Sequence, residues 1–160
     1  MAEKEHAPES VWDYPRPPAM DASDERVVVT HGGVVIADST DTIRVLETSH
    51  PPTYYIPLKD FTPGVLEPVA GQTMCEFKGA ASYADVVVDG QRLSRAVWWY
   101  PTPHRDFTRL ADHAALYPGM FDDVRVNGEK VVAQEGDFYG GWITSRVKGP
   151  FKGAPGTWGW

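Results

Sequence analysis

Three segments of the chain share one pattern, in which an apolar run, a tight polar turn containing glycine and a second run follow one another. They are VVVTHGGVVIA (27–37), DVVVDGQRLSRAVWWY (85–100) and DVRVNGEKVVAQ (123–134). Asp89-Gly90 and Asn127-Gly128 favour the primed turns of two-residue hairpins, because both central residues must adopt positive φ, and Gly32-Gly33 can do the same. The pattern therefore predicts three β-hairpins and a mainly β fold.

The remaining segments predict further strands and a single helix. Aromatic and β-branched residues enrich 42–48, 74–79 and 142–147, which we expect to be strands. Apolar residues recur at helical spacing from Phe107 to Tyr117, after Asp106 as a suitable N-cap and before Pro118-Gly119, so one short α-helix is expected near 106–117. A short 3₁₀ turn is expected within 56–61.

Length and composition agree with a single domain that is rich in turns. The 160 residues include 15 glycines and 14 prolines, where average usage of about 7% and 5% would give about 19 of the two together. One domain over 1–160 is expected, with a flexible end at 1–8. The irregular segments 8–18 and 149–160 carry the large aromatics Trp12, Tyr14, Phe151, Trp158 and Trp160. Because disordered tails are poor in aromatic residues, both segments are expected to pack against the body.

Charge and cysteine content argue against several kinds of partner. Lys and Arg number 15 against 22 Asp and Glu, a net charge of −7, so we expect no nucleic-acid partner. The apolar runs are too short for a membrane span, and the first ten residues lack the apolar core of a secretion signal, which indicates a cytoplasmic protein. Cys75 is the only cysteine, and the five histidines show no paired ligand spacing, so no disulfide and no metal are expected. The oligomeric state stays open.

Six segments that cover nearly the whole chain stand together in a recognisable order. They are ESVWDYPRPP (9–18), RVLETSHPPTYYIP (44–57), CEFKGAASY (75–83), AVWWYP (96–101), DFYGGWITS (137–145) and GPFKGAPGTWGW (149–160). Together they closely resemble the bacterial family known as domain of unknown function 427. Members of that family usually have a tryptophan where this chain has Phe77.

The resemblance implies a β-tent-like fold, in which two antiparallel sheets meet at an angle and enclose a cavity. Relatives of that fold include zinc proteins and a methionine sulfoxide reductase domain, but this chain lacks their paired CxxC motifs, so the resemblance implies the scaffold without the metal. The family also carries a nucleotidyltransferase label. The chain has no GxxxxGK[ST] loop. Two-metal nucleotidyl transfer needs close carboxylate pairs, and the acidic clusters here are expected in a tail (Asp21, Asp24, Glu25) and at a hairpin entry (Asp122, Asp123), a poor place to coordinate metal inside a cavity, so the motifs do not support that label.

Aromatic side chains gather in the segments that carry the resemblance. Alternation places Trp98 and Tyr100 on one face of the segment 93–100, and Tyr55, Tyr83 and Tyr139 are further candidates. Aromatic residues in strands usually belong to the core, but rings in this number also suit a wall that stacks a planar or cationic ligand.

Glu47 is the leading polar candidate. It shares the strand parity of Ile43 and Val45, so we expect it on the inner face, across a cleft from Trp98 and Tyr100. A carboxylate on an apolar face needs a partner. That partner is either a cation in a structural ion pair (Arg44, Lys78 or Arg95) or a ligand that Glu47 would anchor or deprotonate.

Arg44, His50, Cys75 and Lys78 complete the ligand-binding candidates. His50 lies in a loop that leaves a strand end, where sites often lie, although an exposed loop histidine explains it equally. Cys75 is either a small buried hydrophobe or a reactive thiol, and Lys78 is expected on the opposite face of the same strand. We expect Glu47, Cys75 and Trp98 to line one cavity.

Three functions are consistent with these observations. The first is a small-molecule-binding β domain with an aromatic cleft between its sheets, of unknown ligand and cofactor. The second is an enzyme that uses Cys75 or Glu47 in that cleft. The third is a protein-interaction module that presents an edge strand or an aromatic patch.

Overall fold

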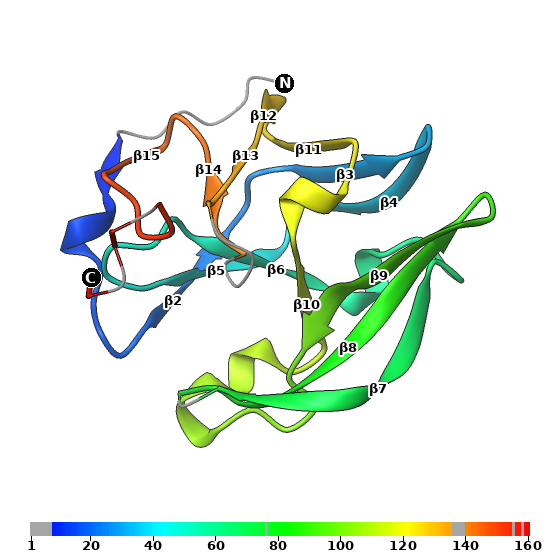
Figure 1. Cartoon of the computed structure of the whole chain (residues 1–160), viewed down its shortest axis with the longest axis horizontal. Helices are drawn as coiled ribbons and strands as arrows, with labels where there is room; N and C mark the ends of the chain where they lie inside the picture. The colour runs from blue at the N-terminus through cyan, green and yellow to red at the C-terminus, as the bar shows by residue number, and fades with distance from the viewer. Residues whose placement is uncertain (1–7, 76, 136–139, 155, 158) are drawn as a thin grey trace.

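The chain folds into a mainly β structure, as predicted, and contains several antiparallel sheets (Figure 1). The computed structural model describes residues 8–75, 77–135, 140–154, 156–157 and 159–160. The largest sheet has seven strands, in the order β2 (Ala19–Ser23), β5 (Thr42–Leu46), β6 (Thr53–Pro57), β10 (His113–Leu116), β9 (Gln91–Trp99), β8 (Gly79–Val88) and β7 (Leu66–Cys75). A second sheet has four, in the order β12 (Glu129–Lys130), β11 (Asp123–Val126), β3 (Val27–His31) and β4 (Val34–Ser39).

The three predicted hairpins are confirmed. They are β3–β4, β8–β9 and β11–β12, and each turn consists of the predicted dipeptide. The six turn residues have φ between 47° and 79°, the left-handed region that primed turns require. Glycine, asparagine and aspartate are the residues that adopt this region most readily, so local chemistry alone fixed these turns.

The other predicted strands differ from the structure at their ends. β5 stops at Leu46, before Glu47. The segment 142–147 holds the short strand β14 (Trp142–Ile143), which pairs with β13 (Val132–Ala133), and ends on the first residue of β15 (Val147–Lys148). The segment 74–79 is a hairpin end and not a strand, because Cys75 ends β7 and pairs with Gly79 at the start of β8. The predicted 3₁₀ turn is present as η2 (Leu58–Asp60).

The predicted α-helix over 106–117 is wrong in length and type. The chain forms the 3₁₀ segment η3 (Arg105–Leu110), interrupted by non-helical dihedrals at Phe107, and then enters the strand β10. β10 pairs with β6 on one side and β9 on the other. Its residues 114–116 alternate between the two faces of the sheet, so backbone pairing and burial on both faces outweigh the helical spacing.

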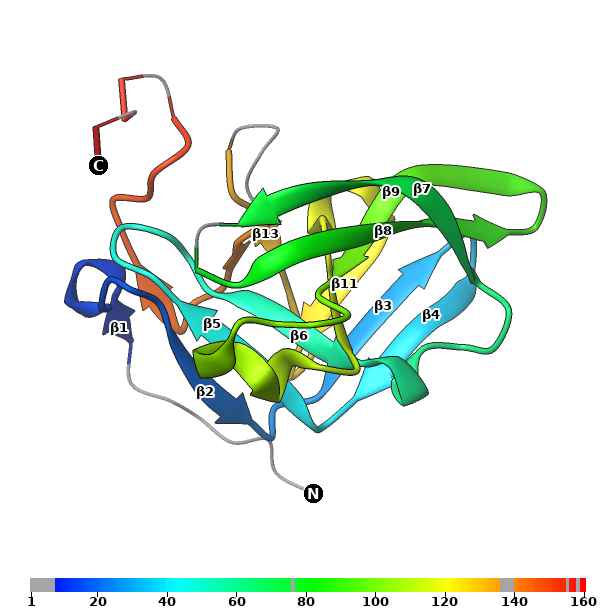
Figure 2. The same cartoon turned by 90° about the horizontal axis from the view of Figure 1, so that it is seen from below.

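The two faces of the seven-stranded sheet bury different cores. One face carries Tyr54, Val97 and Leu116, which pack with residues of the four-stranded sheet. The opposite face carries their chain neighbours Tyr55 and Trp98, which form a second core with no contribution from the four-stranded sheet. Figure 2 shows β7 and β8 arching over the side on which β5 and β6 lie.

Both terminal segments are packed, as predicted for their described residues. β1 (Glu9–Ser10) pairs in parallel with β15 (Val147–Lys148), and it is followed by the 3₁₀ turn η1 (Val11–Asp13). Val11 and Tyr14 form a third apolar cluster with Val147, against which Phe151 packs. Trp158 and residues 1–7, where a flexible end was predicted, lie outside the described residues. None of the described helices is long and apolar enough to cross a membrane.

Candidate functional site

A cleft of about 250 Å³ opens on the face of the seven-stranded sheet that is turned away from the four-stranded sheet. Its lining comes from Glu47, His50, Thr53, Tyr55, Thr73, Lys78, Ala81, Tyr83, Trp98, Tyr100, Tyr117, Gln134 and Gly140. The expectation of a cleft between the two sheets is therefore corrected. That space is filled by the first core, because alternation sends half of the large side chains of β6 and β9 into it.

Five aromatic rings line the cleft, those of Tyr55, Tyr83, Trp98, Tyr100 and Tyr117. Trp98 packs against Tyr117 with ring centroids 4.5 Å apart, and the ring of Tyr55 lies 6.5 Å from Trp98 and 6.3 Å from Tyr100. Gly140 lies directly on the indole of Trp98, where any Cβ would collide with the ring. The rings thus pack against one another in one T-shaped and two tilted pairs.

The phenols of Tyr55 and Tyr100 are held in their protonated form. Burial raises the pKa of both, and their mutual contact raises that of Tyr100 further, while hydrogen bonds from Trp98 and Tyr100 partly offset the effect at Tyr55. A protonated phenol can donate a hydrogen bond and cannot act as a base near neutral pH. The cleft wall is therefore a set of neutral rings.

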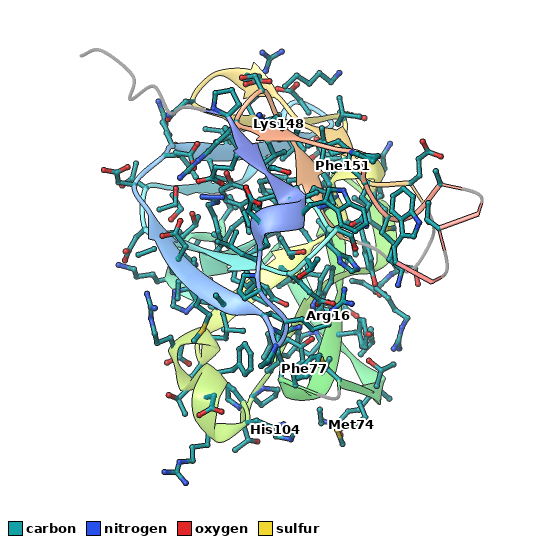
Figure 3. All side chains as sticks on the ribbon, turned by 90° about the vertical axis from the view of Figure 1, so that its left-hand side faces the viewer. Arg16, Met74, Phe77, His104, Lys148 and Phe151 are labelled. Carbon is teal, nitrogen blue, oxygen red and sulfur yellow. The ribbon has the colours of Figure 1, made fainter. Side chains whose placement is uncertain are left out.

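Glu47 lines the same cleft as Trp98 and Tyr100, but it lies just beyond the end of β5 and not on its inner face, and its partner is not one of the three predicted cations. Its Oε2 atom lies 3.3 Å from Arg16 of the N-terminal segment and 3.8 Å from Nδ1 of His50. Figure 3 shows Arg16 on the side of the molecule where that segment meets the β7–β8 end. The side chain of Glu47 is 26% exposed, so this is a partly solvated pair at the rim.

His50 is fixed in the same loop. Its Nδ1 atom lies 2.8 Å from the carbonyl oxygen of Thr48, to which it donates. Burial lowers the pKa of His50, and Lys152 and Arg16 lower it further, against the opposing effects of the Thr48 carbonyl and Glu47. The neutral imidazole is therefore the favoured form.

The β7–β8 turn brings Lys78 to the cleft. Its Nζ atom lies 6.0 Å from the ring centroids of both Tyr100 and Phe107. Cys75, at the end of β7, is not among the lining residues, contrary to expectation; it packs on the second core and its thiol contacts Tyr100. The prediction that Cys75 lines the cleft and the prediction that Lys78 lies on the opposite face both assumed one continuous strand. The chain turns after Cys75, so strand parity does not extend to Lys78.

Tyr83 is held at the cleft by contacts that the sequence did not reveal. Its hydroxyl lies 2.7 Å from Oγ1 of Thr73 on β7, and the guanidinium of Arg95 lies 4.1 Å from its ring centroid. Arg95 has φ of 51° within β9, where the register of β8 and β9 shifts, and its backbone N–H donates to Asp85. This β-bulge re-aims the Arg95 side chain over Tyr83.

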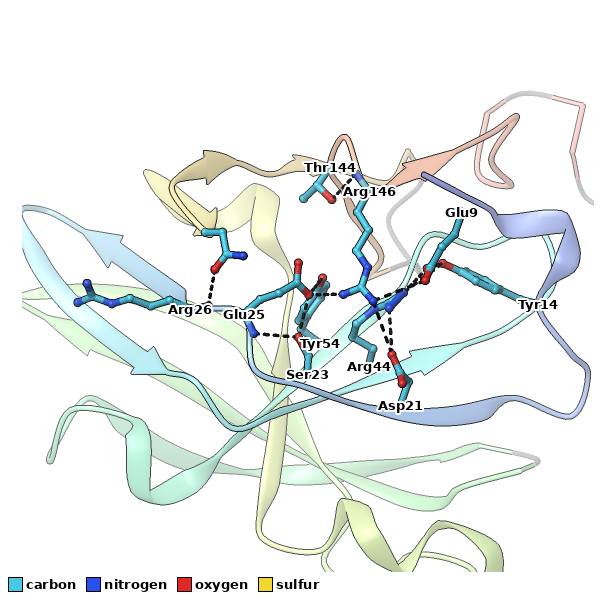
Figure 4. A network of polar contacts seen from close by, with 11 residues as sticks. Glu9, Tyr14, Asp21, Ser23, Glu25, Arg26, Arg44, Tyr54, Thr144 and Arg146 are labelled. Carbon is cyan, nitrogen blue, oxygen red and sulfur yellow. Dashed lines mark hydrogen bonds and ion pairs between the residues drawn. The ribbon is translucent and has the colours of Figure 1, made fainter. Parts of the chain in front are cut away.

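Arg44 does not reach the cleft. It is fully buried on the other side of β5, where it contacts Glu9 at 2.6 Å and Asp21 at 3.0 Å (Figure 4). Arg146 lies beside it and pairs with the buried Glu25 at 2.5 Å. This network joins both terminal segments to β2 and β5 and is structural.

One predicted site residue lies outside the described residues, and several residues of the cleft were not predicted from the sequence. Tyr139, a predicted candidate, lies outside the described residues. Thr53, Thr73, Tyr117 and Gln134 line the cleft but were not predicted; strand parity with Tyr55 would have found Thr53. Among the described residues, no group of three or more His, Cys, Asp or Glu could hold a metal ion.

The chain matches a known protein family. The sequence profile of a family described as Domain of unknown function (DUF427), with the short name NTP_transf_9, matches residues 19–127. That match includes the cleft strands β6 to β10. No curated protein matches the chain.

Proposed function

The chain belongs to the DUF427 family, and from this premise we propose that it is a small-molecule-binding domain whose ligand occupies the aromatic cleft. The observation that carries the proposal is the convergence of five aromatic rings on one cavity of about 250 Å³ whose lining also holds Glu47, His50 and Lys78. Ligand sites typically combine apolar and aromatic walls with a few placed polar groups, and occupy about 300 Å³ or more. A ligand smaller than a typical drug therefore suits this cleft.

Binding is favoured over catalysis by the state of the candidate catalytic groups. Cys75 lies outside the lining, and the carboxylate of Glu47 is paired with Arg16. A nucleophile or general base must reach a bound substrate, and neither group combines that reach with a neighbour that would activate it.

A thermal-shift screen of small planar and cationic metabolites tests the proposal. A ligand at 100 times its Kd stabilises the folded state by about 2.7 kcal/mol, which raises the melting temperature measurably. Hits are repeated with Ala81→Leu, which places a larger side chain in the cleft, and with Ala80→Leu on the opposite face of β8 as the matched control.

We expect at least one compound to stabilise the wild type and Ala80→Leu but not Ala81→Leu. Near-ultraviolet circular dichroism of the unliganded variants checks that both retain the native aromatic packing. The proposal is overturned by a screen without hits, or by hits that stabilise Ala81→Leu as strongly as the wild type.

A further inference from the structure

The polar lining of the cleft is divided between groups that are already paired within the protein and groups that are not. The carboxylate of Glu47 is paired with Arg16. The Gln134 amide donates to the Lys152 carbonyl at 2.7 Å and accepts from the Gly141 N–H at 3.1 Å. These groups are therefore already engaged in part before any ligand arrives.

Lys78, Thr53 and Tyr117 are different. Within the described part of the chain, the Lys78 ammonium and these two hydroxyls make no hydrogen bond or ion pair with another residue, although all three residues line the cleft. Each of them can donate a hydrogen bond, and only Lys78 carries a charge. The available groups of the cleft thus call for an acceptor-rich ligand.

The position of Lys78 strengthens this preference. Its Nζ atom is 6.0 Å from the centroids of Tyr100 and Phe107, at the outer limit of a cation–π contact, so the rings satisfy it only weakly. The Lys78 ammonium makes no ion pair with another described residue, so an anionic group of a ligand could pair with it while the flat part of the ligand lies against the aromatic wall. A charge-assisted hydrogen bond of this kind contributes more than a neutral one.

We propose that the ligand is a small planar anion, namely a carboxylate attached to an aromatic or conjugated ring, with the carboxylate at Lys78 and the ring against Trp98 and Tyr117. This inference rests on the proposed function and narrows it to one ligand class. The cavity volume of 250 Å³ equals about eight water volumes at about 30 Å³ each, which suits a single ring with one substituent. The protein's net charge of −7 offers no general attraction for anions, so selectivity for one must come from the cleft.

Three probes of nearly equal shape separate charge from ring stacking. Benzoate is an anion, benzamide is neutral and benzamidine is a cation. Their affinities are measured by tryptophan fluorescence titration and by saturation-transfer NMR, with the wild type, Lys78→Met, Lys78→Arg and, as the matched control, Lys59→Met in the exposed turn η2. Melting temperatures confirm that each variant is folded.

We expect benzoate to bind the wild type at least about tenfold more tightly than benzamide, and benzamidine to bind least. Lys78→Met should lose about tenfold in benzoate affinity and little in benzamide affinity, whereas Lys78→Arg and Lys59→Met should stay within about threefold of the wild type. Added salt should weaken benzoate binding only where the charge at position 78 is kept.

Three results overturn the inference. The first is benzamide or benzamidine binding as tightly as benzoate, which leaves the small-molecule function intact and removes the anion preference. The second is a benzoate affinity that is unchanged in Lys78→Met. The third is no binding of benzoate at all. If Lys78→Met does not fold, equal benzoate affinity at low and high salt in the wild type contradicts the ion pair instead. Failure of the proposed function itself is recognised separately, in the thermal-shift screen. It fails if no compound stabilises the wild type, or if every stabilising compound acts equally on Ala81→Leu.

Discussion

Tyr54 and Tyr55 are neighbours in the sequence but belong to different parts of the molecule. Tyr54 stacks on Trp142 in the core between the two sheets, and Tyr55 lies in the wall of the cleft. This division follows from strand alternation, which also placed Trp98 and Tyr100 correctly. Alternation could not identify Arg16 as the partner of Glu47, because the two residues meet through loops whose path no local pattern fixes.

A pH-dependent stability follows from the buried position of His50. Burial lowers the pKa of this residue below its ordinary value of 6.5. As the pH falls, the unfolded chain takes up a proton on His50 near pH 6.5, whereas the folded chain binds it only at lower pH. The stability that neutral His50 contributes is therefore complete above about pH 6.5 and is lost as the pH falls towards the pKa of His50 in the folded state. We expect the melting temperature to fall less between pH 7.5 and 5.5 in His50→Asn than in the wild type.

Melting curves at half-unit pH steps measure this difference. Asparagine keeps a side-chain donor near the position of Nδ1, so the contact with the Thr48 carbonyl can persist. His104→Asn, at an exposed histidine, is the matched control and should keep the wild-type slope. If the melting temperature falls equally with pH in the wild type and in His50→Asn, His50 does not contribute to the pH dependence of stability.

The elements of the fold were predictable where local chemistry decides them. The three two-residue hairpins depend on residues that accept positive φ, and all three are present. β10 was mistaken for part of a helix, because its alanines and leucine carry no strong strand preference and the pairing with β6 and β9 comes from far along the chain. The end of β7 was mistaken for a strand interior for a different reason: the chain reverses there, and its partner, β8, begins only four residues after Cys75.

The bulge between β8 and β9 stores backbone strain at Arg95. A residue with a Cβ at φ of 51° costs about 1 kcal/mol more than glycine at the same place. We therefore expect Arg95→Gly to be more stable than Arg95→Ala by about 1 kcal/mol in urea unfolding. Both variants lose the contact of Arg95 with Tyr83. The difference between their free energies of unfolding therefore reports only the cost of holding a residue with a Cβ at positive φ.

The same pair of substitutions at Arg92 gives the control. Arg92 lies in β9 outside the positive-φ positions, so alanine should be the more stable replacement there. If glycine and alanine rank in the same order at both positions, the strain at Arg95 is not real.

At the scale of the whole molecule, charged residues hold the chain ends in place. Arg44 and Arg146 lie between carboxylates from β1, β2 and the turn before β3, and Tyr54 donates a further hydrogen bond to Glu25 at 3.0 Å (Figure 4). The sequence predicted that both tails pack, from their aromatic content. It did not predict this network, because its members are separated by up to 137 positions, as between Glu9 and Arg146.

Breaking this network should be costly. The side chains of Arg146 and Glu25 are only 13% and 5% exposed, and removing one partner of a buried pair leaves the other charge unpaired at a cost of about 3 kcal/mol. We expect Arg146→Met to lower the free energy of unfolding by roughly that amount, and the double variant with Glu25→Gln to recover part of it. Urea unfolding gives both values.

Arg26→Met is the matched control for this prediction. Arg26 and Asp38 also form an ion pair, at 2.8 Å, but both side chains are well exposed, and exposed pairs contribute little. Comparable losses in Arg26→Met and Arg146→Met would contradict the view that burial of the network ties the chain ends down.

The parallel pairing of β1 with β15 determines how the molecule responds to tension. Because the two strands run in the same direction, the chain enters β1 at one end of the pair and leaves β15 at the other. A force that pulls the two ends of the chain apart therefore shears this pair, loading its hydrogen bonds together instead of peeling them one at a time. The short ladder is reinforced by the contacts of Glu9 with Arg44 and Arg146, which resist the same shear.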